Sequence, residues 1–210
     1  MNLGDDELAV LASTANDATA FGELVRRHQG VVRGFLRRLA KDVTQADDLA
    51  QDTFLKAFQK IGSYKGPGRF RSWLLSIAYR EFLMSRRKAD SWNRVMGVIG
   101  MGQNVSETAE AADGLVEEAQ PHHGDQVAAA LDLERGLVHL KGPEKEALLL
   151  CDAYGFSHAE AAKMMKAPLG TVKSHVLRGR KRLRAVLGLD SDGSEKTTIS
   201  EGTTGLSHDG

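Results

Sequence analysis

The sequence has little cysteine, proline or aromatic side chain, and it has no long hydrophobic run. Among its 210 residues Cys151 is the single cysteine, which excludes an internal disulfide and a cysteine-based zinc site within one chain. No apolar stretch approaches the ~20 residues that span a bilayer. The N-terminal stretch MNLGDDELAV is acidic and lacks the basic region of a secretory signal. These absences predict a cytoplasmic protein.

Signals of catalysis are also scarce. The phosphate-binding loop G-x-x-x-x-G-K-[ST] is absent. The acidic residues are scattered along the chain without obvious pairs, and no cluster has the spacing of metal ligands. We therefore predict no enzymatic activity, no cofactor, no bound metal and no small-molecule substrate.

Charge is balanced overall but segregated along the chain. Lysine plus arginine and aspartate plus glutamate each total 28. Residues 21–88 carry fifteen basic and six acidic side chains, and residues 127–188 carry eleven and six. The segments 1–20, 89–126 and 189–210 are each net acidic. Two basic blocks with acidic connectors indicate two modules that bind a polyanion. On charge alone, ordinary solvated surface stays open as the alternative.

Hydrophobic periodicity predicts an all-helical protein. In the first half, apolar residues recur at spacings of three and four over residues 16–40, 45–61 and 70–87. Thr44 is the expected N-cap of the second of these helices. The stretch 62–69 holds three glycines and a proline and is expected to be a loop. The sequence contains no strand pattern and no internal repeat.

A second set of helices follows an acidic, glycine-rich stretch. Periodicity resumes over residues 127–140, and a short helix is expected over 144–153. Ser157 and Glu160 form a capping box before the next helix, and Thr171 is expected to cap a last helix. The predicted organisation is two small helical domains over residues 1–88 and 127–188, a flexible acidic linker over 89–126 and a disordered acidic tail over 189–210.

Residues 157–184 form the most specific motif, a helix-turn-helix. From Lys173 to Arg184 there are six basic residues and no acidic one, and an amphipathic helix with such an outer face can enter a major groove. Arginine and lysine can bond guanine edges there, serine can contact either kind of base, and leucine can pack on a thymine methyl. Arg180 and Arg182 are better placed for phosphates. A solvated basic helix is the alternative. The candidate duplex-binding residues are Thr171, Lys173, Ser174, Leu177, Arg178, Arg180, Lys181 and Arg182.

The first basic block mixes basic and aromatic side chains over the loop 62–69 and the helix after it. This composition suits single-stranded nucleic acid, because the charges bind the backbone and the rings stack on bases. Trp73 is expected to belong to the core, whereas Tyr64 and Tyr79 are better candidates for stacking. The candidate strand-binding residues are Tyr64, Lys65, Arg69, Arg71, Tyr79, Arg80, Arg86 and Arg87.

A polar stripe is predicted on the helix over residues 45–61. Spacings of three and four place Asp48, Gln51 and Asp52 together, opposite Phe54 and Phe58. An acidic stripe on a basic domain suits a basic protein partner better than DNA, and a solvated face is the alternative. The candidate partner-binding residues are Asp47, Asp48, Gln51, Asp52 and Lys56.

The chain resembles the bacterial extracytoplasmic-function (ECF) sigma factors, the small group of the sigma-70 family. Two blocks carry the resemblance in this order: DDLAQDTFLKAFQKIGSYKGPGRFRSWLLSIAY and GFSHAEAAKMMKAPLGTVKSHVLRGRKRLR. They lie within residues 20–88 and 127–187. The resemblance implies a two-domain helical protein, not itself an enzyme, that directs core RNA polymerase to promoters.

The same resemblance implies a role for each candidate surface. The stripe of Asp48, Gln51 and Asp52 would dock on the clamp helices of the polymerase beta-prime subunit, and the beta flap is a second implied contact. The segment from Ser63 to Lys88 would hold the unpaired −10 strand. The segment 170–178 would read the −35 element. The implied partners are core polymerase, promoter DNA and an anti-sigma factor.

One departure from the family pattern concerns the −10 helix. Arg80 and Met84 stand where family members usually carry Asn and Asp or Asn, so the −10 preference is expected to differ.

Three other functions stay open. A decoy that titrates an anti-sigma protein has no need of the basic last helix, a stand-alone repressor leaves residues 45–61 without a purpose, and a nucleic-acid-processing enzyme lacks clustered acids.

Overall fold

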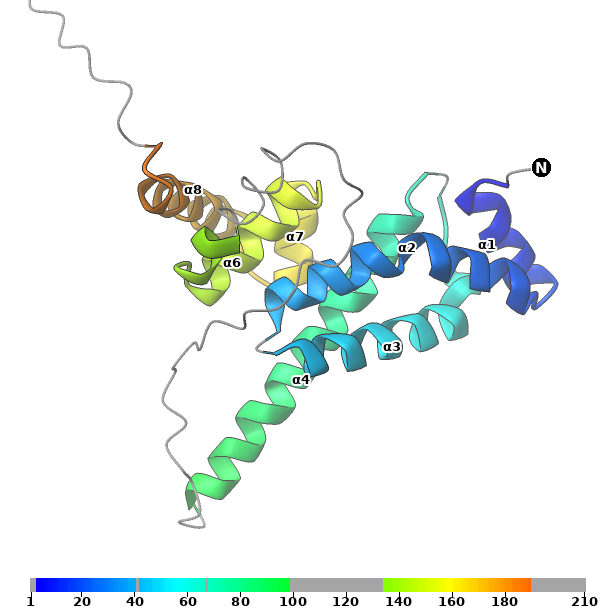
Figure 1. Ribbon diagram of the computed structural model, residues 1–210, viewed down its shortest axis with the longest axis horizontal. Helices are drawn as coiled ribbons and strands as arrows, with labels where there is room; N and C mark the ends of the chain where they lie inside the picture. Colours follow the sequence, from blue (N-terminus) through cyan, green and yellow to red (C-terminus); the bar gives the residue numbers. More distant parts are fainter. Residues whose placement is uncertain (1–2, 41, 67, 99–133, 190–210) are drawn as a thin grey trace, which may run out of the picture.

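The computed structural model describes residues 3–40, 42–66, 68–98 and 134–189, and the regular secondary structure in these ranges is entirely helical. The prediction of an all-helical fold is confirmed. The helices form two groups in chain order, which lie against each other where α4 meets α7 (Figure 1). The predicted tail, apart from Leu189, and the predicted linker beyond Val98 lie outside the described residues.

The first group consists of α1 (Asp5–Thr14), α2 (Ala18–Leu39), α3 (Val43–Lys60), the short 3-10 helix η1 (Ile61–Ser63) and α4 (Phe70–Val98). α2 packs against α1, α3 and α4, so its apolar stripe forms the centre of this group. Burying such stripes is the main source of stability for helices of this length. The most deeply buried side chains of the group include Leu24, Val32, Phe35, Leu36, Ala46, Ala57, Leu74, Leu75, Ala78 and Tyr79.

The sequence pattern did not predict α1. Its Leu8, Ala9 and Ala12 are buried, and the helix packs along α2. Asn16 turns the chain with a φ of 49°, in the left-handed region that Asn tolerates. Asp17 then caps α2, because its carboxylate accepts hydrogen bonds from the backbone N–H groups of the first turn. The predicted helix over 16–40 therefore begins at residue 18.

α3 begins earlier than predicted because a different residue caps it. The carboxylate of Asp42 accepts a hydrogen bond from the backbone N–H of Gln45 at 2.7 Å. Asp42 is therefore the N-cap, and Thr44, which was expected to cap this helix, lies inside its first turn. The short side chain of aspartate serves this role at least as well as threonine.

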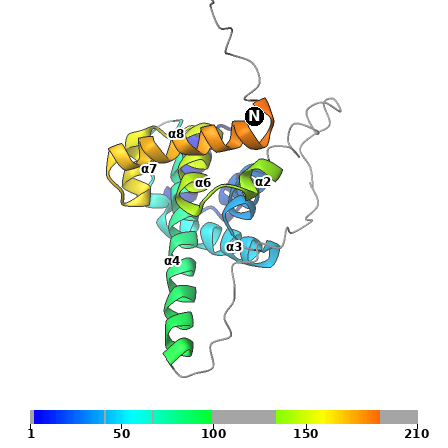
Figure 2. The same ribbon diagram turned by 90° about the vertical axis from the view of Figure 1, so that its left-hand side faces the viewer.

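α4 begins at Phe70 as predicted but ends well beyond its predicted end at residue 87. It continues to Val98 without a proline or glycine before Gly97. Residues 89–126 are acidic, glycine-rich and only weakly periodic, which is why the sequence pattern indicates a linker from residue 89. The last turns of the helix leave even apolar side chains open, since Trp92 is 61 % exposed and Val95 is 50 % exposed. Figure 2 shows the end of α4 standing clear of the other helices.

The second group contains α6 (Gly142–Leu148), the π-helical turn η2 (Leu149–Ala153), α7 (His158–Met165) and α8 (Leu169–Val186). Residues 134–138 are helical as well. The predicted helix over 144–153 corresponds to α6 and η2 together. It begins earlier because Pro143 lies in its first turn, where a missing N–H costs nothing.

The capping box of α7 is confirmed. The hydroxyl of Ser157 accepts from the N–H of Glu160 at 3.2 Å, and the Glu160 carboxylate accepts from the N–H of Ser157 at 2.9 Å. Lys166 ends the helix with a φ of 52°. α8 then begins at Leu169, so Thr171 lies within its first turn and does not cap it, contrary to the prediction.

A close approach between α6 and α8 fixes the position of the last helix. A Cβ atom on Gly179 would lie 3.3 Å from the carbonyl oxygen of Glu144 and 3.7 Å from the Leu148 side chain. Glycine therefore lets the two helices pack closely. Val172 and Val176 are buried on the same side of α8, which leaves the opposite side of the helix open.

Candidate nucleic-acid and polymerase interfaces

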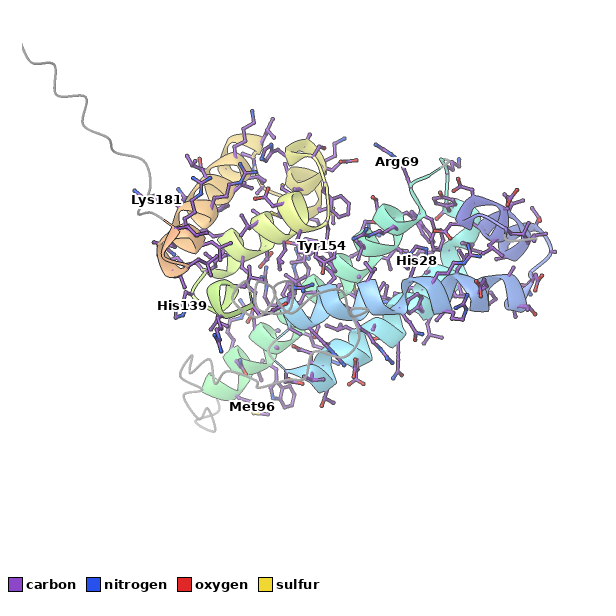
Figure 3. The ribbon with its side chains drawn as sticks, turned by 45° about the horizontal axis from the view of Figure 1, so that its top comes forward. His28, Arg69, Met96, His139, Tyr154 and Lys181 are labelled. Carbon is purple, nitrogen blue, oxygen red and sulfur yellow. The ribbon has the colours of Figure 1, made fainter. Side chains whose placement is uncertain are left out.

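α8 presents a polar face to solvent. Thr171, Lys173, Ser174, Leu177 and Lys181 are all exposed along it. Leu177 is 70 % exposed, which is unusual for leucine and places an apolar group among basic and hydroxyl groups. Figure 3 shows Lys181 on the outer side of the helix. This face has the chemistry that reads base edges and thymine methyl groups in a major groove.

Three arginines of α8 are engaged with carboxylates of the same group. Arg180 donates two hydrogen bonds to Asp152, at 2.8 and 2.7 Å, and these bonds raise the pKa of its guanidinium. The buried Glu144 accepts from Nε of Arg178 at 3.3 Å and from Nη1 of Arg182 at 2.8 Å. A guanidinium has five N–H donors, so each arginine can hold its carboxylate and still bind a phosphate.

The acidic stripe on α3 is open over part of its predicted length. Asp48, Gln51 and Asp52 are exposed and lie on one side of the helix. Leu55 follows on the same side and is 63 % exposed. Sequence reasoning missed Leu55, although its spacing of three from Asp52 could have revealed it. The stripe therefore combines acidic groups with one apolar contact, as suits a protein partner.

The two other residues predicted for this stripe face neighbouring helices. Asp47 lies 3.6 Å from Nε of Arg33 and 3.7 Å from Nη2 of Arg37, both on α2. Lys56 pairs with Glu81, a buried carboxylate of α4. The structure thus brings Asp48, Gln51 and Asp52 together on the surface, whereas Asp47 and Lys56 tie α3 to its neighbours.

An apolar groove of about 530 Å³ lies beside the stripe, between α2 and α3. Phe21, Val25, Phe54 and Phe58 line it, and Gln51 and Leu55 belong to both the groove and the stripe. The groove widens the surface that a partner could cover next to the acidic groups.

α1 holds the loop before α4 in place. The hydroxyl of Tyr64 donates to the carboxylate of Asp6, which also accepts from the N–H of Gly68 at 2.7 Å. The Tyr64 ring packs on Phe70 and on the half-buried Trp73, each with ring centroids 5.5 Å apart. Desolvation and the bond to Asp6 raise the pKa of Tyr64 to about 12. The same bond is the main cause of a lowered pKa at Asp6.

Tyr79 lies between the two groups, contrary to the expectation that it is free to stack on a base. Only 1 % of it is exposed. Its hydroxyl donates to the buried carboxylate of Glu146 on α6, and Arg86 pairs with the same carboxylate. Burial is the main reason that the pKa of Tyr79 is raised. In this arrangement the second group covers the ring, so no base can reach it.

Arg71, another candidate strand-binding residue, also faces the second group. Tyr154 lies at the junction (Figure 3), with its ring 4.8 Å from that of Phe35 and with Arg71 5.9 Å above it. Arg38 donates to the Tyr154 hydroxyl at 2.8 Å and to Glu134 at 2.7 Å. Rings and ion pairs therefore join the groups across a continuous contact.

The remaining candidate strand-binding residues are open. Lys65, Arg80 and Arg87 are exposed. Arg69 is exposed as well, with Nη1 3.7 Å from Oε1 of Glu160 on α7. The open side chains come from the loop before α4 and from the outer side of α4.

Among the described residues no group of histidine, cysteine, aspartate or glutamate is placed to hold a metal ion, and no helix there is long and apolar enough to cross a membrane.

Comparisons with known proteins identify the two groups of helices. The model of Sigma-70 region 2 matches residues 24–91, and that of Sigma-70 region 4 matches residues 130–183. The chain is 32 % identical to the ECF RNA polymerase sigma factor SigE of Mycolicibacterium smegmatis, over 87 % of this chain and 68 % of the relative. The chain belongs to the ECF subfamily of sigma-70 factors. It is also 31 % identical to the RNA polymerase sigma factor CnrH of Cupriavidus metallidurans, over 90 % of this chain and 96 % of that one.

Solved structures of sigma factors share the fold. The sigma factor RpoE in complex with the anti-sigma factor NepR, from Bartonella quintana, has a TM-score of 0.61 and 27 % identity, over 82 % of this chain and 99 % of that one. CnrH in complex with the cytosolic domain of CnrY has a TM-score of 0.54 and 24 % identity, over 89 % and 99 %. The first group of helices is thus region 2 of the ECF factor, and the second group is region 4.

Family membership gives the surfaces their general purpose. As an ECF sigma factor, the protein binds core RNA polymerase and promoter DNA and directs promoter-specific initiation of transcription. Sigma factors are specificity subunits that do not themselves catalyse RNA synthesis. α3 and α4 belong to region 2, and the helix-turn-helix of α7 and α8 belongs to region 4.

Proposed function

We propose that this ECF sigma factor works in the cytoplasm as a non-catalytic subunit that turns on a stress- or signal-responsive set of genes. The observation that carries the proposal is the presence on one chain of an open basic face on α8 and an open acidic stripe on α3. A stand-alone repressor needs the first surface only, and a decoy needs no DNA-reading face. A promoter-selecting subunit needs both.

Region 4 reads the −35 element with the outer face of α8. Lys173, Ser174, Leu177 and Lys181 are open there and supply the donors and the apolar contact that base edges require. The arginines that hold Glu144 and Asp152 keep further N–H groups for phosphates, which fix the helix in the groove.

Region 2 holds the unpaired −10 strand with the loop before α4 and the outer side of α4. Lys65, Arg69, Arg80 and Arg87 are available in the arrangement described here. Tyr79 becomes available only when region 4 moves away. Strand binding therefore favours an arrangement in which the two regions are apart.

Core polymerase binds the exposed stripe of α3. Asp48, Gln51 and Asp52 would contact the clamp helices of the beta-prime subunit, with Leu55 as the apolar contact beside them. Region 4 would contact the beta flap. An anti-sigma factor is the proposed inhibitor, and the similarity to the RpoE of the NepR complex supports this assignment.

Charge-removing variants test the assignment of the α3 stripe. The double variant Asp48→Ala and Asp52→Ala is compared with Asp90→Ala, which removes an exposed acid of the same region outside the stripe. Co-purification with core polymerase should fall at least tenfold for the double variant and stay unchanged for the control, with helical circular dichroism unaltered in both. Equal binding by the wild type and the double variant would contradict the assignment.

A further inference from the structure

The end of α4 has no packing partner among the described residues. Phe82 is the last buried residue of the helix, and every side chain from Arg86 to Val95 is exposed. The match to region 2 ends at residue 91, whereas the helix continues to Val98. Figures 1 and 2 both show this end projecting beyond the other helices. We call residues 87–95 the α4 extension.

The α4 extension has the chemistry of a surface that binds nucleic acid. The segment carries three basic residues, Arg87, Lys88 and Arg94, and one acid, Asp90. Arg94 donates to the backbone oxygen of Asp90 at 3.3 Å, and no described carboxylate forms an ion pair with any of the three basic residues. Trp92 is 61 % exposed beside them. An exposed indole combines a flat apolar surface with an N–H donor, which suits the sugars and phosphates of a DNA backbone. An acidic protein partner would satisfy the charges, but the proposed DNA contacts on this same helix favour DNA.

The extension continues a stripe that begins in the proposed −10 surface. Arg80, Met84, Arg87, Ser91 and Arg94 recur at spacings of three and four, so they lie on one side of α4. At 1.5 Å per residue the stripe is about 21 Å long, which corresponds to roughly six base pairs at 3.4 Å each. DNA held at Arg80 therefore has its neighbouring base pairs within reach of Arg94.

We propose that the α4 extension binds the backbone phosphates of double-stranded DNA between the −10 and −35 elements. Upstream of the unpaired −10 strand the duplex stays intact, which places the contact on the side of the −35 element. The proposal rests on the proposed function of region 2 and adds a duplex contact to it. Phosphate contacts position the protein without reading sequence, so the extension raises affinity for every promoter alike.

Two DNA probes separate this contact from strand binding. The first probe is a promoter identified by transcribing genomic fragments with this holoenzyme. Its DNA is an intact duplex between the −10 and −35 elements. The other carries the same −10 element as a single strand and lacks the duplex upstream of it. Binding of the holoenzyme to each is measured over a range of salt concentrations with wild type, Arg94→Ala, Arg94→Lys and the exposed-arginine control Arg26→Ala.

The expected result concerns the duplex probe alone. Arg94→Ala should weaken its binding roughly fivefold to tenfold at 0.1 M salt and reduce the salt slope by about one, the effect of one lost phosphate contact. Arg94→Lys should restore most of the affinity. Binding of the single-strand probe should be unchanged in all variants, and Arg26→Ala should match the wild type on both probes.

Three other results would overturn the proposal. Equal losses on both probes would assign Arg94 to the −10 strand. No loss on either probe would show that the extension is only a solvated helix end. A wild-type holoenzyme that binds neither probe would instead disprove the proposed function of region 2. It would also disprove the duplex contact proposed for the α4 extension, which rests on that function.

Discussion

At the scale of single residues, Glu144 governs the DNA-facing helix without reaching DNA itself. Its carboxylate is buried on α6 and accepts hydrogen bonds from Arg178 and Arg182 of α8. A buried carboxylate without such partners would be costly. Glu144 therefore fixes the position of the two guanidinium groups. It also sets the direction in which their remaining N–H groups point.

This anchoring separates two kinds of effect on α8. Arg178→Ala should weaken binding to the native −35 duplex by about 1–3 kcal/mol if it contacts a base, and it should also lower the midpoint of thermal unfolding, because Glu144 loses a partner. Lys181→Ala should weaken DNA binding without changing the unfolding midpoint, because Lys181 is exposed on the outer face. Calorimetry and duplex binding measure the two effects. An unfolding midpoint that is the same in Arg178→Ala as in the wild type would contradict the anchoring role.

Sequence reasoning captured local chemistry well and contacts distant in sequence poorly. The Ser157 and Glu160 capping box was predictable because both partners lie within four residues. The burial of Tyr79 was not, because it depends on Glu146, which lies far along the chain on another domain. The same limit explains why Lys56 was assigned to a partner surface although it pairs with Glu81.

At the scale of elements, α1 acts as a clamp on the loop that precedes α4. Its Asp6 holds Tyr64 and Gly68, and its buried side holds α2. The pattern of Leu8, Ala9 and Ala12 is a weak helical signal, because alanine adds little hydrophobicity. The sequence therefore indicates only an acidic segment there, not a helix. The sequence pattern does not predict the α4 extension either, because its few apolar residues, such as Trp92 and Val95, are followed by an acidic, glycine-rich stretch.

The clamp predicts how the loop depends on pH. The pKa of Asp6 is lowered in the folded protein, so its contribution to stability is present above the ordinary pKa of aspartate and is lost as the pH falls below it. The pKa of Tyr64 is raised to about 12, so its contribution is full below the ordinary pKa of tyrosine, near 10, and is lost as the pH rises through 12.

Fluorescence of Trp73, which packs on Tyr64, reports the state of the loop. In a Trp92→Phe background, its emission should stay constant at neutral pH and shift at both the acidic and the alkaline end. Asp6→Asn should remove the acidic transition and weaken the alkaline one. An acidic shift that persists unchanged in Asp6→Asn would show that another group controls the loop.

At the scale of the whole molecule, the contact between regions 2 and 4 covers part of the proposed −10 surface. Tyr79, Arg86 and Arg71 all face region 4 in the described arrangement. Tyr79 cannot pack against region 4 and stack on a base at once, because its ring is buried in this arrangement. Closing of the two regions and binding of the −10 strand are therefore expected to compete.

Glu146→Ala tests that competition. It removes the buried acceptor of Tyr79 and Arg86, and the loss of a charged hydrogen-bonded contact of this kind is worth roughly 1.5–3 kcal/mol, or about a tenfold to hundredfold shift toward separated regions. Small-angle X-ray scattering should show a larger radius of gyration, and affinity for a single-stranded −10 probe should rise. Asp152→Ala, which breaks a contact within region 4, should change neither quantity. A compact Glu146→Ala with unchanged strand affinity would contradict the competition.

The most direct test of the account is in-vitro transcription of fragmented genomic DNA by bacterial core polymerase, with and without this protein. Promoter selection by this protein predicts discrete transcripts that depend on it and share two upstream elements, and Lys181→Ala should reduce those transcripts. Transcripts that are the same with and without the protein, together with no binding to core polymerase, would contradict it.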